Sequence, residues 1–275
     1  MAEDFDPPKG TLMAGRRGLV MGVANRQSIA WGIAAQLAAQ GAELAFAYME
    51  MNEKRVKPLG ESIGVKAYAT FDGFVEGSIE AAFATVEKAL PKLDFLVHAI
   101  GFADRSQIGG SFIDNAERGA FLRAMDISVY SFVEAAKCAA ALMGPGGSMI
   151  TMTYLGSERA IPNYNTMGVA KAALEAATRY IARDLGPRGI RVNAISAGAM
   201  RTLSLAGITG GRSMLGQGRA LSALKEDTTM EGVAGCALWL LSDLGRSTTG
   251  EVVHVDAGFH MMGLPSEAEA APSPA

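Results

Sequence analysis

Residues 18–28 read Gly18-Leu-Val-Met-Gly22-Val-Ala-Asn-Arg-Gln-Ser28, an apolar run followed by a more polar loop. The run predicts a short buried strand, because it is apolar throughout and does not alternate with polar residues. Ser28 is a favoured residue type at a helix N-terminus, and the apolar segment after it predicts a helix that ends near Gly41. The stretch therefore predicts a strand, a loop and a helix in direct succession.

The same alternation continues along the chain. Further apolar runs predict strands at 43–48, 66–70, 94–98, 148–153, 190–195 and 251–255. Periodic apolar positions predict helices at 54–63, 78–90, 117–143, 163–184 and 228–242. Apolar strands that alternate with helices are typical of a parallel sheet covered on both faces. The predicted fold class is therefore α/β, a single-domain Rossmann-like doubly wound parallel sheet with helices on both faces.

We expect three parts along the chain. Residues 1–14 are polar and contain a Pro-Pro pair, which predicts an N-terminal arm, and residues 15–265 form the Rossmann-type domain. Residues 266–275 are small, acidic and Pro-containing, which predicts a disordered tail. Within the domain, residues 199–225 are apolar, glycine-rich and long for a connection, so we interpret them as a substrate-loop insertion over the binding site.

Composition excludes several classes of protein. The net charge of −3 provides no basic field for nucleic acid, and no apolar run approaches the roughly 20 residues of a membrane span. The acidic start, Met1-Ala-Glu-Asp, lacks the apolar region of a signal peptide. Cys138 and Cys236 lie in apolar helical patterns, which favours reduced thiols in a cytoplasmic protein. The three histidines are scattered, so we predict structural roles for them and no metal site.

The first strand, loop and helix are where a doubly wound sheet binds a nucleotide. Gly22 allows the backbone to pass close to a pyrophosphate, and Ser28 supplies a hydroxyl and starts a helix whose free amides would face that anion. The loop does not follow the G-x-G-x-x-G pattern. The second strand ends Tyr48-Met49-Glu50 without an acidic residue at its tip, and Arg26 is available for a phosphate, so NADH and NADPH both stay open.

Tyr164 and Lys171 lie seven positions apart in the helix predicted at 163–184. Two helical turns separate them, so they share one face, with their backbones about 10.5 Å apart along the axis. A nearby ammonium favours the phenolate, which would make the phenol a better donor toward a developing oxyanion. The alternative is a half-buried tyrosine beside a lysine that extends to solvent, a common arrangement on amphipathic helices.

Longer segments of the chain match a known family. They are residues 22–34, 98–102, 154–171, 191–198 and 250–256. Together they resemble the enoyl-acyl-carrier-protein reductases of bacterial fatty-acid synthesis, within the short-chain dehydrogenase/reductase superfamily, and the resemblance runs from about Gly18 to Gly258. Met167 stands four positions before Lys171, where keto-reductases of that superfamily have their tyrosine, so Tyr164 is the expected donor.

The resemblance implies an oxidoreductase that reduces the trans-2 double bond of an enoyl thioester, with NADH as cofactor and NADPH possible. It implies catalytic roles for Tyr154, Tyr164 and Lys171. The implied cofactor-binding residues are Gly22, Ser28, Ile29, Asp72, Gly73, Ala99, Ile100, Gly101, Lys171, Gly198, Met200 and Thr202. The implied substrate-binding residues are Phe102, Ala103, Tyr154, Tyr164, Leu203 and Ile208. The implied partners are an enoyl-acyl carrier protein or enoyl-CoA, with no nucleic acid and no membrane, and the implied assembly is a homotetramer.

The chain also departs from the family pattern, at Met49, Gly73, Ala199, Glu226 and Ala257. These departures leave the cofactor preference and the conformation of the substrate loop open. They also keep two alternatives: a diverged paralogue that acts on another enoyl or carbonyl substrate, and a nucleotide-binding sensor without turnover.

Overall fold

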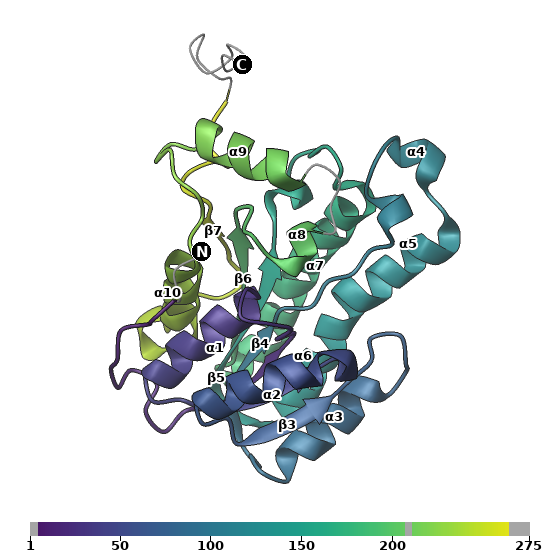
Figure 1. Ribbon diagram of the computed structural model, residues 1–275. Helices are drawn as coiled ribbons and strands as arrows, with labels where there is room; N and C mark the ends of the chain where they lie inside the picture. Colours follow the sequence, from purple (N-terminus) through teal and green to yellow (C-terminus); the bar gives the residue numbers. More distant parts are fainter. Residues whose placement is uncertain (1–4, 207–210, 264–275) are drawn as a thin grey trace.

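The computed structural model describes residues 5–206 and 211–263. Its strands form one seven-stranded sheet in the order β3-β2-β1-β4-β5-β6-β7 (Figure 1). The strands are β1 Arg17–Met21, β2 Glu43–Tyr48, β3 Ala67–Thr70, β4 Leu93–His98, β5 Met143–Thr153, β6 Arg191–Ala197 and β7 Val252–Val255. Every neighbouring pair is parallel. The chain moves outward from β1 to β3 and then returns to β4, so the strand order reverses between β1 and β4.

Helices cover both faces of the sheet, which confirms the predicted doubly wound fold. The longer helices are α1 Ile29–Ala39, α2 Glu53–Ser62, α3 Ser78–Glu87, α5 Arg118–Met125, α6 Ser131–Leu142, α7 Asn165–Leu185, α9 Gly211–Leu221 and α10 Met230–Leu241. One apolar cluster joins the sheet to α3, α6 and α7, and a second joins it to α1, α2 and α10.

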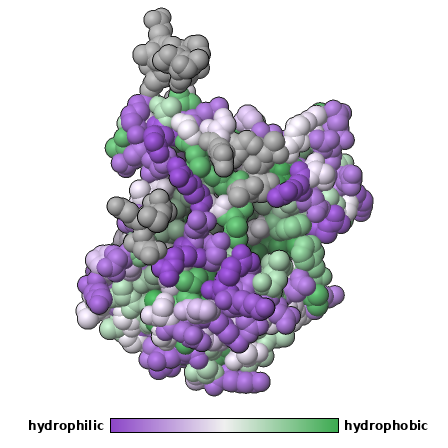
Figure 2. Space-filling view, in the orientation of Figure 1, coloured by the Kyte–Doolittle hydropathy of each residue, from purple (hydrophilic) through white to green (hydrophobic). Residues whose placement is uncertain are grey.

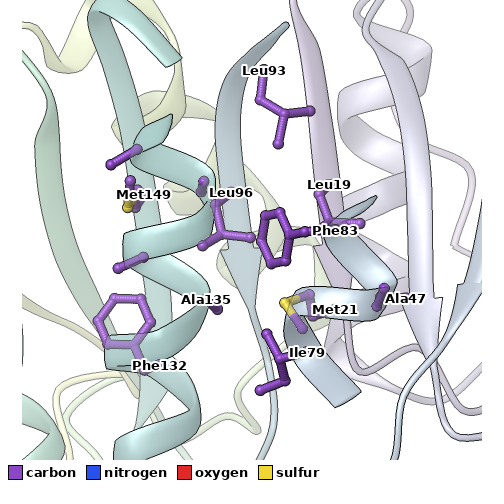
Figure 3. Close-up of a cluster of buried hydrophobic side chains, with 14 of the residues drawn as sticks. Leu19, Met21, Ala47, Ile79, Phe83, Leu93, Leu96, Phe132, Ala135 and Met149 are labelled. Carbon is purple, nitrogen blue, oxygen red and sulfur yellow. The ribbon is translucent and has the colours of Figure 1, made fainter. Parts of the chain in front are cut away.

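Strand β1 shows how the sequence divides its side chains between the two clusters. Leu19 and Met21 belong to the first cluster, whereas Val20 between them belongs to the second. This alternation is the ordinary two-residue period of a strand, and both faces are apolar because both are covered. Figure 3 shows Leu19 and Met21 beside Phe83 and Ile79 of α3.

Several boundaries differ from the predictions. The helix predicted at 117–143 is α5, a π-helical turn at Asp126–Tyr130 and α6. Strand β5 begins at Met143, before the predicted start at 148, and its pairing with β4 shifts register between Leu93 and Phe95.

The segment predicted as a loop at 199–225 contains two helices, α8 Leu203–Ala206 and α9. The short helix α4 Phe112–Asn115 was not predicted either. The predicted tail at 266–275 lies outside the described residues. Within residues 5–206 and 211–263, none of the helices combines the length and the apolar character that crossing a membrane requires.

Candidate active site

A cavity of about 220 Å³ opens at the carboxyl ends of β1, β4, β5 and β6. It is lined by residues that follow these strands directly: Gly22, residues 99–101, Tyr154 and Gly198. The strand order reverses between β1 and β4, and doubly wound sheets bind their ligands at such a reversal. In Figure 2, hydrophobic residues are visible in the recess between α9 and the helices that cover the sheet.

Gly22 brings the end of β1 close to the end of β4. Its φ is 99°, and a Cβ at this position would lie 2.3 Å from the carbonyl oxygen of Ala99. Both the backbone conformation and the close approach therefore require glycine. The missing side chain therefore lets the Ala99 carbonyl pack against the end of β1, next to the site where the sequence predicts a pyrophosphate.

Ser28 precedes α1 in an extended conformation, as the sequence predicts for its N-terminus. Its hydroxyl donates to the carbonyl oxygen of Asn25 at 2.6 Å and accepts from the amide of Ala24 at 3.4 Å, so it orders the loop. Ser28 makes no side-chain bond to the amides of α1. Ser28, Ile29 and Ala30 line the cavity, so the first turn of α1 faces it and its amides can serve an anion.

Tyr164 and Lys171 meet in this cavity, as the sequence predicts. Helix α7 begins at Asn165, so Tyr164 is its N-cap residue and lies just outside the helix. The Lys171 side chain lies on the second turn, and its Nζ donates to the carbonyl oxygen of Met152 at 2.8 Å. Both residues are 8% exposed, so the alternative of a lysine extended to solvent is wrong.

Burial controls the protonation of both groups. Burial lowers the pKa of Lys171 to about 8, against an opposing effect of the Glu175 carboxylate. Burial raises the pKa of Tyr164, and neighbouring Tyr154 adds to this shift. The expectation that Lys171 would favour the Tyr164 phenolate is therefore wrong, because burial and neighbouring Tyr154 both raise the pKa of Tyr164. Tyr164 is a neutral phenol at physiological pH, which makes it a hydrogen-bond donor.

Tyr154 packs against Tyr164 in the same cavity. The ring centroids are 4.8 Å apart with an edge-on inclination of 65°. A Cβ at Gly156 would lie 2.3 Å from Cδ1 of Tyr164, so the missing side chain at 156 makes room for the ring. Burial raises the pKa of Tyr154, and the Asp256 carboxylate adds to the shift. Two neutral phenols therefore stand side by side at the end of β5.

His98, at the end of β4, is fully buried beneath the cavity. Its Nε2 lies 2.9 Å from the Ser131 hydroxyl, which itself donates to the carbonyl oxygen of Ile127. Its Nδ1 lies 3.0 Å from the Thr151 hydroxyl, and burial lowers the His98 pKa to about 3. Because Ser131 already donates elsewhere, it accepts from Nε2–H, and Nδ1 accepts from Thr151. The predicted structural role of His98 is confirmed.

The π-helical turn at Asp126–Tyr130 supplies a residue that the sequence analysis missed. The Ser128 hydroxyl accepts from the Phe102 amide and donates to the Phe102 carbonyl, both at 2.9 Å. It thereby fixes the loop after β4 that lines the cavity. Apolar periodicity runs through this region without a break, so no local signal marked Ser128.

Most of the predicted site residues lie together. The cavity lining includes Gly22, Ser28, Ile29, Ala99, Ile100, Gly101, Tyr154, Tyr164, Lys171, Gly198, Met200, Thr202 and Leu203. Asp72, Gly73, Phe102 and Ala103 are not part of this lining, and their roles stay predictions. Ile208 lies outside the described residues. Met214, which the sequence offers as a candidate for lining an acyl channel, also lies in the lining, and the structure adds residues that were not predicted, among them Met152, Thr153 and Leu205. Among the described residues, no group of three His, Cys, Asp or Glu side chains could hold a metal ion.

Comparisons with known proteins agree over most of the chain. The family model described as enoyl-(acyl carrier protein) reductase matches residues 22–260. A relative from Rhizobium meliloti, named as an enoyl-acyl-carrier-protein reductase of the NADH type, is 53% identical over 256 residues. That match covers 93% of this chain and 95% of the relative.

Solved structures of similar proteins show the same architecture. An enoyl-acyl-carrier-protein reductase from Anaplasma phagocytophilum, solved in complex with NAD, has a TM-score of 0.90 and 48% identity. The match covers 94% of this chain and 99% of that one. An enoyl-acyl-carrier-protein reductase from Bacillus cereus, solved with NADP⁺ and an indole naphthyridinone, has a TM-score of 0.89 and 43% identity, with 92% of this chain and 100% of that one covered.

Proposed function

Because the chain belongs to the family of enoyl-(acyl carrier protein) reductases, we propose that it reduces the trans-2 double bond of enoyl thioesters with NADH in bacterial fatty-acid synthesis. The substrate is an enoyl group carried on acyl carrier protein, and an enoyl-CoA presents the same thioester. When bound, NADH would supply the hydride that reaches the β-carbon of the substrate. The electrons of the double bond then move toward the thioester carbonyl oxygen, and a proton added at the α-carbon completes the reduction. The observation that carries this proposal is the burial of Tyr164 and Lys171 in one cavity at the carboxyl edge of the sheet.

The residues around the cavity fit a nicotinamide dinucleotide. Gly22 lines the cavity at the end of β1, where a fold of this kind holds a pyrophosphate, and the first turn of α1 can donate amide hydrogens to that group. Lys171 is placed to hold the nicotinamide ribose through its remaining donors, because Nζ uses one hydrogen bond on Met152. The NADH preference follows the name of the Rhizobium relative, and NADPH is the alternative to test.

Tyr164 stabilises the negative charge that develops on the thioester carbonyl oxygen. Its raised pKa keeps the phenol protonated, so it donates a hydrogen bond to that oxygen. A preorganised donor of this kind is typically worth about 2.7–4 kcal/mol of transition-state stabilisation. Tyr154 packs on the Tyr164 ring and limits its orientations, so it acts as a positioning residue that also shapes the pocket.

Lys171 contributes a positive charge behind the reacting atoms. With a pKa of about 8, the ammonium is mostly protonated at pH 7. Its bond to Met152 fixes the charge at the end of β5. A charge in a buried site is poorly screened, so it favours an adjacent oxyanion more strongly than an exposed lysine would.

The test is consumption of NADH, followed at 340 nm with crotonyl-CoA, in the wild type and in Tyr164→Phe. We expect turnover with NADH that exceeds turnover with NADPH, and a loss of about 100- to 1,000-fold in kcat for the variant. Wild-type protein that binds NADH but reduces no enoyl thioester would refute the proposal and favour the nucleotide-binding sensor.

We also propose that the protein is cytoplasmic and assembles as a homotetramer. Exposed apolar side chains support a contact between copies. Tyr130, the last residue of the π-helical turn, and Val133 of α6 lie three residues apart, and Val169 and Tyr180 lie eleven residues apart on α7. Each spacing places its pair on one side of a helix. Light scattering coupled to gel filtration measures the assembly, and a monomer would contradict this part of the proposal.

A further inference from the structure

A second cavity adjoins the one that contains Tyr164 and Lys171. It has a volume of about 160 Å³, and four residues line both cavities: Tyr154, Gly198, Ala199 and Met214. One water molecule occupies about 30 Å³ in the liquid, so this space can take several methylene-sized groups. The two cavities therefore meet at a boundary that includes Tyr154, whose ring packs on that of Tyr164.

This shared boundary consists mainly of small or flexible groups. Gly198 has no side chain, Ala199 has a methyl group, and Met214 has an unbranched side chain that adapts to its surroundings. Of the four residues, only Tyr154 is large and rigid. An extended apolar chain that enters past Tyr154 can therefore continue into the second cavity when Met214 changes its rotamer.

The charged residues in the lining of the second cavity are already paired. Asp227 accepts from Nε of Arg219 at 3.1 Å. Asp256 accepts from Nδ1 of His260 at 2.9 Å and from the amides of Gly258 and His260 at 3.0 and 2.8 Å. Groups that are paired in this way do not require water inside the cavity.

Apolar groups make up much of the remaining lining. Ile161 and Pro162 come from the segment before α7, Leu215 comes from α9, and Phe259 comes from the turn after β7. Gln217 and Thr228 also line the cavity, but a lining that is largely apolar and whose charged groups are paired suits an alkyl chain.

The turn that carries Phe259 is held from two sides. Arg159 donates to the carbonyl oxygen of Met262 at 3.1 Å and also to that of His260. The amide of Leu224, just after α9, donates to the carbonyl oxygen of Ala257 at 3.1 Å. The half-buried Phe259 ring is therefore fixed between the segment that follows Tyr154 and the end of α9.

We propose that the second cavity receives the distal part of the substrate's acyl chain and that Phe259 limits the chain length that the enzyme accepts. This inference rests on the proposed reduction of enoyl thioesters. Each methylene that moves from water into an apolar site contributes about fourfold to binding. A larger side chain at 259 that excludes two methylenes should therefore lower the specificity for long substrates by roughly 15-fold.

The test compares kcat/KM for trans-2-enoyl-CoA substrates of four and twelve carbons, with NADH. Phe259→Trp should lower the ratio of the twelve-carbon to the four-carbon value by on the order of tenfold, and Phe259→Ala should raise this ratio. Met261→Ala is the matched control, because Met261 lies in the same turn, is 64% exposed and lines neither cavity. Its ratio should equal that of the wild type.

The outcomes separate this inference from the proposed function. Wild-type reduction of the four-carbon substrate, together with an unchanged ratio in both Phe259 variants, would overturn the role of Phe259 and leave the reductase intact. Failure of the wild type on every chain length would refute the proposed function itself. If circular dichroism shows that the Phe259 variants do not fold, Ile161→Phe narrows the same cavity from another wall, and an unchanged ratio there would overturn the inference.

Discussion

Replacing Gly156 with alanine should slow turnover by displacing the Tyr164 ring. Gly156 lies in the short 3-10 helix at Leu155–Ser157, directly after Tyr154. An added Cβ would lie 2.3 Å from Cδ1 and 2.8 Å from Cε1 of Tyr164, whereas ordinary contact begins at 3.4 Å. One group must therefore move by about 3.4 − 2.3 = 1.1 Å. A displacement of about 1 Å at a reacting group can lower the rate about 100-fold.

The assay measures kcat with crotonyl-CoA and, separately, the affinity for NADH by fluorescence. We expect kcat of Gly156→Ala to fall about 100-fold, while the NADH affinity changes little, because Gly156 does not line the cavity that contains Tyr164 and Lys171. Overpacking should also lower the free energy of unfolding by about 1–3 kcal/mol. Gly186→Ala is the control, since a Cβ there meets open space and its φ of −52° suits alanine. Wild-type kcat in Gly156→Ala would refute the idea that contact at 156 sets the position of the Tyr164 ring.

Three further predictions concern Lys171, Ser128 and Ala257. The kcat should fall as pH rises through about 8, because burial lowers the pKa of Lys171 from 10.5 to about 8 and the ammonium loses its proton there. A kcat–pH profile checks this, and Lys171→Gln should have a low kcat that does not fall near pH 8. Ser128→Ala leaves the amide and carbonyl of Phe102 without their hydroxyl partner and should lower the free energy of unfolding by about 1–3 kcal/mol in urea denaturation. An unchanged midpoint of the urea transition would contradict the idea that the Ser128 hydroxyl stabilises the loop at Phe102. Ala257 has a left-handed φ of 55°, so Ala257→Gly should raise the free energy of unfolding by up to about 1 kcal/mol, and a lower melting temperature would count against strain at this turn.

The parts of the site that the sequence predicts well are those defined by short segments. Gly22 follows an apolar strand and precedes a helix, so its place at the carboxyl end of β1 follows from local pattern alone. Tyr164 and Lys171 are two turns apart, and this spacing brings them to one cavity even though α7 starts one residue after Tyr164. A part of the site can therefore be predicted from the sequence when a single short segment contains all of its residues.

Contacts between distant segments are harder to predict. Ser128 reaches Phe102 because a π-helical turn alters the direction of the helix, and the apolar pattern of 117–143 contains no sign of that turn. Helix α9 was missed because its sequence is rich in glycine, which lowers intrinsic helix propensity. Its end is tied to the turn after β7 through the bond from Leu224 to Ala257, a contact that cannot be read from either segment alone.

The protonation states of Tyr164 and Lys171 show why composition and spacing give an incomplete view of a site. Proximity alone suggests that the ammonium makes the phenol more acidic, but each group is buried, and burial disfavours the charged form of both. The phenol pKa therefore rises while the ammonium pKa falls. Near neutral pH this leaves a neutral donor beside a cation that can lose its proton. In the proposed mechanism the oxyanion is stabilised by a hydrogen bond from Tyr164 and by the positive charge on Lys171, so only the second contribution should vary with pH near 8.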